Sequence, residues 1–167
     1  MTDALAAFEA DLLGGGIVTR VLEAWSGGRV HAEVAADVAD ASPETRERLG
    51  VEADTPLGFR RVQLMRGDVV LSRADNWFVP ERLTVEMREA LTDSDTPFGV
   101  VIARLEPTRE TLSCERLAGD PMVRVQALVR AGDGTPVAEV METYARAVLN
   151  WRAPARAGVQ GGTGTAS

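Results

Sequence analysis

Two strand-like segments joined by a tight turn constrain the fold of this chain more than any other feature of its sequence. Residues 57–65 read LGFRRVQLM, residues 69–80 read VVLSRADNWFVP, and Arg-Gly-Asp at 66–68 lies between them. Alternating apolar residues on both sides of a short glycine-containing turn are typical of a β-hairpin. The tripeptide is better explained as this turn than as an adhesion motif. Because a hairpin makes its strands antiparallel, we expect an antiparallel sheet.

Helical patterns precede the hairpin, and most of the remaining strand patterns follow it. Apolar residues three or four positions apart predict helices, here at 3–13, 42–50 and 83–93. Apolar stretches and alternation predict further strands, at 29–39, 100–117, 122–131 and 137–151. Residues 17–25 could form either a helix or a strand. The predicted fold class is therefore α+β, with an antiparallel sheet.

Length and charge limit the domain organisation and the class of partner. The 167 residues suffice for one domain, which we place at 1–152, with a tail of disordered composition at 153–167. The net charge of −7 argues against nucleic acid or an anionic membrane as partner. The sequence has neither a signal peptide nor an apolar run of about 20 residues, so we expect a cytoplasmic protein. The lysine-free composition indicates a bacterium of high genomic GC content, and no pattern indicates an oligomeric state.

The usual signals for metal, cofactor or nucleophile chemistry are missing. The glycines at 14–16 have neither the P-loop nor the GxGxxG spacing. The only cysteine, Cys114, is better explained as a half-buried strand thiol, and the only histidine, His31, as a surface residue. No cluster of His, Cys, Asp and Glu has metal-ligand spacing. We therefore expect no metal and no cofactor.

Charged residues occupy strand positions that should face the core. Arg60 shares strand parity with Val62 and Leu64, and Glu142 shares it with Tyr144. Buried charges are costly unless they are paired or bound to a ligand. The pattern leaves three explanations open: an Arg60–Glu142 salt bridge, edge-strand side chains that reach water, or a ligand site.

Four stretches in this order resemble chorismate lyase, which removes pyruvate from chorismate to give 4-hydroxybenzoate. They are LLGGGIVTRVLEAW at 12–25, FRRVQLMRGDVVLSRADNWFVPERL at 59–83, TPFGVVI at 96–102 and GTPVAEVMETYARAVL at 134–149. The resemblance implies a six-stranded antiparallel sheet whose flanking helices enclose a ligand cavity. The same fold serves as the effector-binding domain of some transcription regulators. A winged DNA-binding domain precedes it there, and because the residues ahead of the hairpin leave no room for one, we expect none in this chain.

The resemblance also implies which residues hold a carboxylate. Arg60 would match the arginine that grips the ring carboxylate through a bidentate, charge-assisted pair. The spacing back from Pro80 favours Arg61 instead, while the apolar alternation favours Arg60, and both stay open. The backbone N–H groups of Val18 and Phe98 would complete the cradle.

In the resemblance Glu142 would match the glutamate near the ring hydroxyl and the departing enolpyruvyl ether. Aromatisation of the ring drives this elimination. The protein has only to orient a small aromatic or cyclic carboxylate in a dry pocket and to move a proton. The reaction needs no metal or cofactor.

Asn76 departs from the family pattern. It lies four residues before Pro80, where the family has a second cavity-facing arginine, and Arg73 has the opposite strand parity. Either the cavity takes a less charged ligand, or Arg104 or Arg109 supplies the charge. The first alternative corresponds to a non-catalytic or repurposed binding module for a small aromatic or acidic metabolite, and the lyase is the other candidate function.

Overall fold

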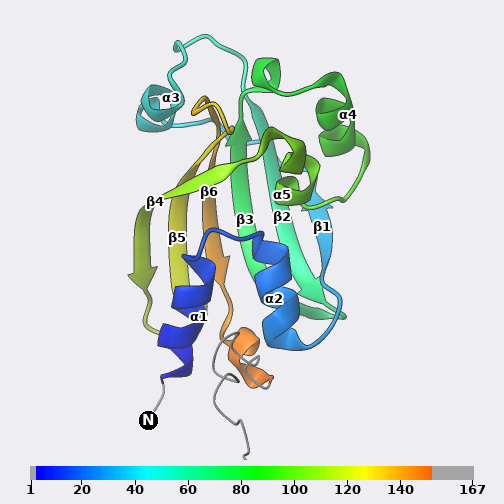
Figure 1. Cartoon of the computed structure of the whole chain (residues 1–167), viewed down its shortest axis with the longest axis vertical. Helices are drawn as coiled ribbons and strands as arrows, with labels where there is room; N and C mark the ends of the chain where they lie inside the picture. Colours follow the sequence, from blue (N-terminus) through cyan, green and yellow to red (C-terminus); the bar gives the residue numbers. More distant parts are fainter. Residues whose placement is uncertain (1–2, 152–167) are drawn as a thin grey trace, which may run out of the picture.

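The computed structural model describes residues 3–151. The hairpin predicted from the sequence is present and forms part of one antiparallel sheet (Figure 1). Strands β2 (Gly58–Arg66) and β3 (Val69–Phe78) form the hairpin, and Gly67 in the turn has a φ of 59°. A glycine adopts this left-handed conformation at little cost. The tail predicted at 153–167 lies outside the described residues.

Six strands form the sheet, in the spatial order β1-β2-β3-β6-β5-β4. The other four are β1 (His31–Ala35), β4 (Thr108–Arg116), β5 (Val123–Arg130) and β6 (Pro136–Tyr144). All neighbouring pairs are antiparallel. The α+β class and the open six-stranded antiparallel sheet with flanking helices are thus confirmed.

Five α-helices and three 3₁₀ segments complete the described part of the chain. The α-helices are α1 (Ala4–Leu12), α2 (Val18–Ser26), α3 (Pro43–Leu49), α4 (Val85–Asp93) and α5 (Phe98–Val101). The 3₁₀ segments are η1 (Pro80–Arg82), η2 (Ala103–Leu105) and η3 (Arg146–Asn150). Within residues 3–151 none of the helices has both the length and the apolar character needed to cross a membrane.

Residues 17–25, which the sequence left open, form helix α2. Leu22 and Trp25 lie on one helical face and are buried, and Gly27 ends the helix with a φ of 70°. Two predicted strands are shorter than expected. Residues 100–107 form α5, η2 and a loop rather than the start of β4, and the chain leaves β6 after Tyr144 to form η3.

Helices α1, α2, α4 and α5 pack on one face of the sheet, called the inner face below (Figure 1). They contribute to two core clusters there. In the first cluster Phe8 of α1 and Trp25 of α2 pack against Tyr144 of β6 and its neighbours. In the second, Met87 of α4 and Phe98 of α5 pack against the other end of the strands. Side chains from both clusters line one cavity between them.

Helix α3 covers part of the opposite face of the sheet. Leu49 of α3 packs against Leu128 and Val79 there. Thr45 and Arg48 of the same helix donate hydrogen bonds to Glu139 of β6, whose side chain is only 2% exposed. Helix α3 is therefore fixed to the sheet by an ion pair as well as by apolar contact.

Candidate functional site

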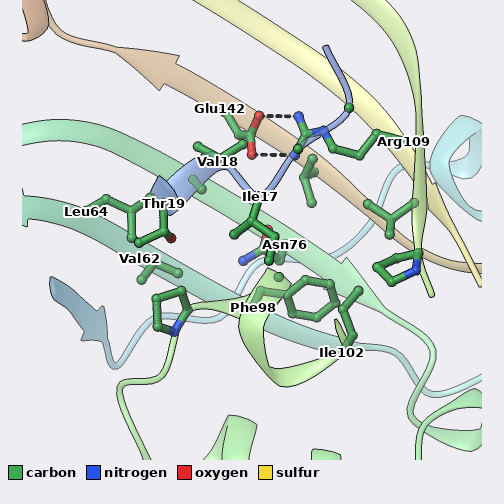
Figure 2. Close-up of a pocket in the computed structure, with 18 residues that line it drawn as sticks. Ile17, Val18, Thr19, Val62, Leu64, Asn76, Phe98, Ile102, Arg109 and Glu142 are labelled. Carbon is green, nitrogen blue, oxygen red and sulfur yellow. Dashed lines mark hydrogen bonds and ion pairs between the residues drawn. The ribbon is translucent and has the colours of Figure 1, made fainter. Parts of the chain in front are cut away.

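A cavity of about 110 Å³ lies where the first turn of α2 faces α5 and the inner face of the sheet (Figure 2). Most of its wall is apolar, including Ile17, Val62, Leu64, Phe98, Ile102 and Val140. The polar side chains in the wall are Thr19, Asn76, Arg109 and Glu142. An apolar pocket with a few convergent polar groups is the usual form of a small-molecule site.

The start of α2 offers unused hydrogen-bond donors to this cavity. Its N-cap residue is Ile17, which has no side chain able to cap a helix. The backbone N–H groups of Val18 and Thr19 have no acceptor among residues 3–151, and both residues line the cavity. Free N–H groups at the positive end of a helix favour an anion.

The glycines before α2 keep this end of the cavity open. Gly15 has a φ of 86°, so only glycine adopts its conformation without strain. Gly16 needs no such conformation, and a Cβ atom built on it would meet no atom within 4 Å. Both glycines line the cavity, so their missing side chains leave room beside the free N–H groups.

Asn76 lies in the cavity wall with an unused amide. The residue is 3% exposed and lines the cavity, and its side chain takes part in none of the side-chain hydrogen bonds within residues 3–151. In the sheet Asn76 is paired with Arg60 on one side and Val140 on the other. Because buried amides are normally hydrogen-bonded, this one is available to a ligand.

Arg60 is buried beside the cavity and does not line it. It is 3% exposed, and its Nη2 donates to the Ser94 carbonyl oxygen at 2.9 Å. Its Nε and Nη1 have no partner among the described residues. Burial lowers the pKa of Arg60, and only the exposed Asp95 works against that effect. The inward orientation predicted from strand parity is found, but direct contact with the cavity is not.

Arg109, rather than Arg60, is the partner of Glu142. Its Nη1 and Nη2 donate to the two carboxylate oxygens of Glu142 at 3.0 and 2.6 Å (Figure 2). The Tyr144 hydroxyl donates to Glu142 Oε1 at 2.9 Å. Burial opposes the charge on Arg109, but the charge and hydrogen bonds of Glu142 raise its pKa overall. Burial, reinforced by the Glu142 charge, raises the pKa of Tyr144.

The predicted Arg60–Glu142 salt bridge is therefore wrong. Strand parity placed both side chains on the inner face, but it could not show that the Arg109 side chain reaches across from β4. Arg109 was one of two candidates for supplying charge to the cavity. The other, Arg104, is exposed and does not line it.

Arg61 lies on the opposite face of the sheet. Its Nε and Nη2 donate to the carboxylate of Asp75 at 2.7 and 3.0 Å, and its Nη1 donates to Asp37. The alternative in which Arg61 faces the cavity is therefore wrong, because neighbouring residues of a strand point to opposite faces. Asp75 of β3 is thus the partner of Arg61 on that face.

The remaining predicted site residues meet at the cavity. Val18, Asn76, Phe98 and Glu142 all line it, although they come from four different elements. Thr19 also lines it and was not predicted from the sequence. No group of three or more His, Cys, Asp and Glu side chains in residues 3–151 is arranged to hold a metal ion.

One curated protein shares substantial sequence with the chain. The "uncharacterized protein y4mC" of Sinorhizobium fredii is 31% identical over 182 aligned positions, which cover 90% of this chain and 77% of the relative. No protein-family model matches the chain.

Solved structures of transcriptional regulators have the same fold. PhnF from Mycobacterium smegmatis superposes with a TM-score of 0.62 at 17% identity, over 87% of this chain and 70% of PhnF. The effector domain of PhnF alone gives 0.59 at 16% identity, over 79% of this chain and 90% of the domain. YydK from Bacillus subtilis, described as a possible transcriptional regulator, gives 0.53 at 15% identity, over 76% of this chain and only 62% of YydK. At these identities the likeness shows the fold alone.

Proposed function

The chain belongs to the same family as y4mC of Sinorhizobium fredii, and we propose that it is a binding module for a small, largely apolar monocarboxylate. The proposal is drawn from the cavity, because the name of y4mC states no activity. The observation that carries this proposal is the meeting of unused donors in the cavity wall. The free N–H groups of Val18 and Thr19 and the amide of Asn76, which takes part in none of the side-chain hydrogen bonds within residues 3–151, all border the same space. A carboxylate would satisfy them together.

The buried charges favour a single negative charge on the ligand. Arg60 and Arg109 contribute two positive charges, and Glu142 contributes one negative charge. Asp95 is exposed, so water and salt screen its charge. The excess of one positive charge among these three side chains matches a monocarboxylate, and Asn76 provides a neutral partner where a second arginine would favour a dianion.

The size and polarity of the cavity limit the rest of the ligand. A dry engineered cavity of about 150 Å³ holds benzene. The present cavity is smaller, about 110 Å³, so a ring or a short branched chain fits only if it also occupies the opening of the cavity. Chorismate, with its ring and enolpyruvyl group, is bulkier. The apolar wall formed by Phe98, Ile102 and Val140 suits a hydrocarbon body.

The fold agrees with binding that involves no reaction. The effector domain of PhnF has the same fold over most of its length. A module that recognises a metabolite needs a preformed cavity and complementary charge, both of which the described residues have. It needs no group that is free to transfer a proton.

Benzoate, benzamide and benzylamine test the proposal because they share a ring and differ in charge. Benzoate is expected to raise the melting temperature of the protein, and the neutral and cationic analogues to leave it unchanged. Asn76→Leu should weaken benzoate binding about 10–100-fold, since a hydrogen bond to a charged group contributes about 1.5–3 kcal/mol. Isothermal titration calorimetry measures the affinities.

Gln63→Leu is the matched control, because Gln63 lies on the opposite face of the sheet and lines no part of this cavity. It should bind benzoate like the unmodified protein. Equal binding of benzoate and benzamide, or full affinity in Asn76→Leu, would contradict the proposal.

A chorismate-lyase activity is the second candidate. It is favoured by Glu142, which lines the same cavity as the anion donors. It is disfavoured by the bonds that Glu142 makes, because both carboxylate oxygens accept from Arg109 and one also accepts from Tyr144. A carboxylate whose two oxygens both accept hydrogen bonds from the protein is poorly placed to exchange a proton with a leaving group.

Incubation with chorismate tests the lyase directly. We expect 4-hydroxybenzoate and pyruvate to form no faster with the protein than in buffer. Faster release of both products, lost in Glu142→Gln, would establish the lyase and replace the binding proposal.

A further inference from the structure

We propose that Glu142 is a built-in substitute for a second ligand carboxylate, which occupies Arg109 and thereby restricts the cavity to monocarboxylates. This inference rests on the proposed function and names the residue that sets its substrate class. Without Glu142, the Arg109 guanidinium would be free to bind the second carboxylate of a dicarboxylic acid.

The first support is the geometry of the ion pair. Two nitrogens of Arg109 face two oxygens of Glu142, the bidentate arrangement by which arginine recognises a carboxylate group. Both residues line the cavity, so a ligand that enters it meets this pair. Arg109 has no other hydrogen-bond acceptor among the described residues.

The second support is the position of the pair relative to the other anion donors. Asn76 is opposite Val140 in the sheet, and Glu142 is two residues further along β6 on the same face. Such diagonal neighbours are about 7–8 Å apart. The Glu142–Arg109 pair is therefore within reach of a second substituent on a ring whose carboxylate lies at Asn76 and the start of α2.

The third support is the hydroxyl of Tyr144. It is fully buried and donates to the Glu142 oxygen that also accepts from Arg109 Nη2. This bond fixes the carboxylate against Arg109 and reduces its freedom to turn toward a ligand. The acid is thus positioned as part of the wall, where it repels a second carboxylate.

Glu142→Gln tests the inference with benzoate and isophthalate as probes. The unmodified protein should bind benzoate more tightly than isophthalate. In Glu142→Gln the affinity for isophthalate relative to benzoate should rise about 10–100-fold, since the second carboxylate gains a charge-assisted pair with Arg109. If the variant is too unstable for titration, a larger rise in melting temperature with isophthalate than with benzoate reports the same preference.

The double variant Arg109→Gln/Glu142→Gln is the matched control, because it also lacks the Glu142 charge but has no arginine to bind a second carboxylate. Its preference for benzoate should resemble that of the unmodified protein. An unchanged preference in Glu142→Gln, or an equal gain in the double variant, would overturn the inference.

Failure of this inference is distinguishable from failure of the proposed function. If the unmodified protein binds benzoate, but Glu142→Gln keeps the same preference for benzoate over isophthalate, then only this inference is overturned. Absence of benzoate binding overturns the proposed function, and a gain of isophthalate binding in Glu142→Gln over the double variant would then still support the role of Arg109.

Discussion

Arg48→Met is expected to lower the free energy of unfolding by about 3–5 kcal/mol at neutral pH, because it leaves a buried carboxylate without its counter-charge. The carboxylate belongs to Glu139, which is 2% exposed, whereas the Arg48 side chain is 33% exposed. Thr45 Oγ1 and Gln126 Nε2 also donate to Glu139, at 2.5 and 3.3 Å, but neither carries a charge. A loss of this size is a large part of the stability of an ordinary domain.

The pH dependence of stability should reverse in the same variant. In the unmodified protein burial raises the pKa of Glu139, but the Arg48 and Thr45 hydrogen bonds outweigh burial and lower it from its usual 4.5. A carboxyl whose pKa is lower when folded contributes stability above its unfolded pKa, and this contribution is lost as the pH falls through the folded value. Without Arg48 burial prevails and the folded pKa is raised, so protonation of Glu139 should stabilise the variant as the pH falls from 7 toward 4.5.

Urea unfolding of both proteins between pH 4 and pH 7 measures these opposite slopes. Arg48→Met/Glu139→Gln should regain much of the lost stability at pH 7, because no buried charge remains. Arg124→Met is the control, since it breaks an exposed 3.4 Å pair with Glu115 and should cost about 0–1 kcal/mol. A loss at pH 7 no larger than that of the control would show that Glu139 does not depend on Arg48.

The same ion pair shows where sequence patterns stop being informative. Helix α3 was predicted closely, because Ser42 caps its start and Gly50 ends it, as the structure shows. Alternation along β6 places Glu139 on the opposite face from Glu142. That face would be solvated if α3 did not cover it, and no local pattern predicts where α3 packs. The burial of Glu139 therefore depends on contacts between segments that are far apart in the sequence.

Strand parity was informative about the arginines in the hairpin and less so about their partners. It favoured Arg60 on the inner face and Arg61 on the outer face, where the structure places them. It did not identify Arg109 as the partner of Glu142, because β4 is an edge strand with an irregular register between Thr111 and Ser113. Alternation counted through such an irregularity does not fix which side chains face inward.

The cavity itself could be predicted only through the resemblance. Val18, Asn76 and Phe98 line it, but their spacing along the chain contains no periodicity that would group them. They meet because the order of the strands brings β3 beside β6 and the two core clusters leave a gap between them. The ion pair between Glu142 and Arg109 could not be predicted at all, because it depends on side-chain contacts between strands that are not neighbours in the sheet.

Arg60→Met is expected to stabilise the ligand-free protein and to weaken its binding of a carboxylate. The buried guanidinium of Arg60 has one hydrogen bond, to the Ser94 carbonyl oxygen, and two nitrogens without partners. Replacing buried charges by apolar side chains of similar volume often stabilises a protein by about 1–4 kcal/mol. The gain should be measurable by urea unfolding.

Binding should change in the opposite direction because Arg60 lies directly beside Asn76 in the sheet. A carboxylate held at Asn76 would lie within the field of the buried guanidinium, whose charge no carboxylate of residues 3–151 meets within salt-bridge distance. Loss of this interaction should weaken benzoate binding about tenfold or more. Such opposite effects on stability and binding are expected where a protein keeps an unfavourable charge for its ligand.

Arg61→Met is the matched control for this prediction. It removes the neighbouring arginine, whose partners Asp37 and Asp75 lie on the other face of the sheet, so benzoate affinity should stay unchanged. If Arg60→Met is less stable than the unmodified protein and binds benzoate normally, then Arg60 serves to hold the Ser94 loop. If it is more stable and binds weakly while Arg61→Met binds normally, then the buried charge of Arg60 serves the ligand, because the weaker binding cannot then be attributed to a less stable protein.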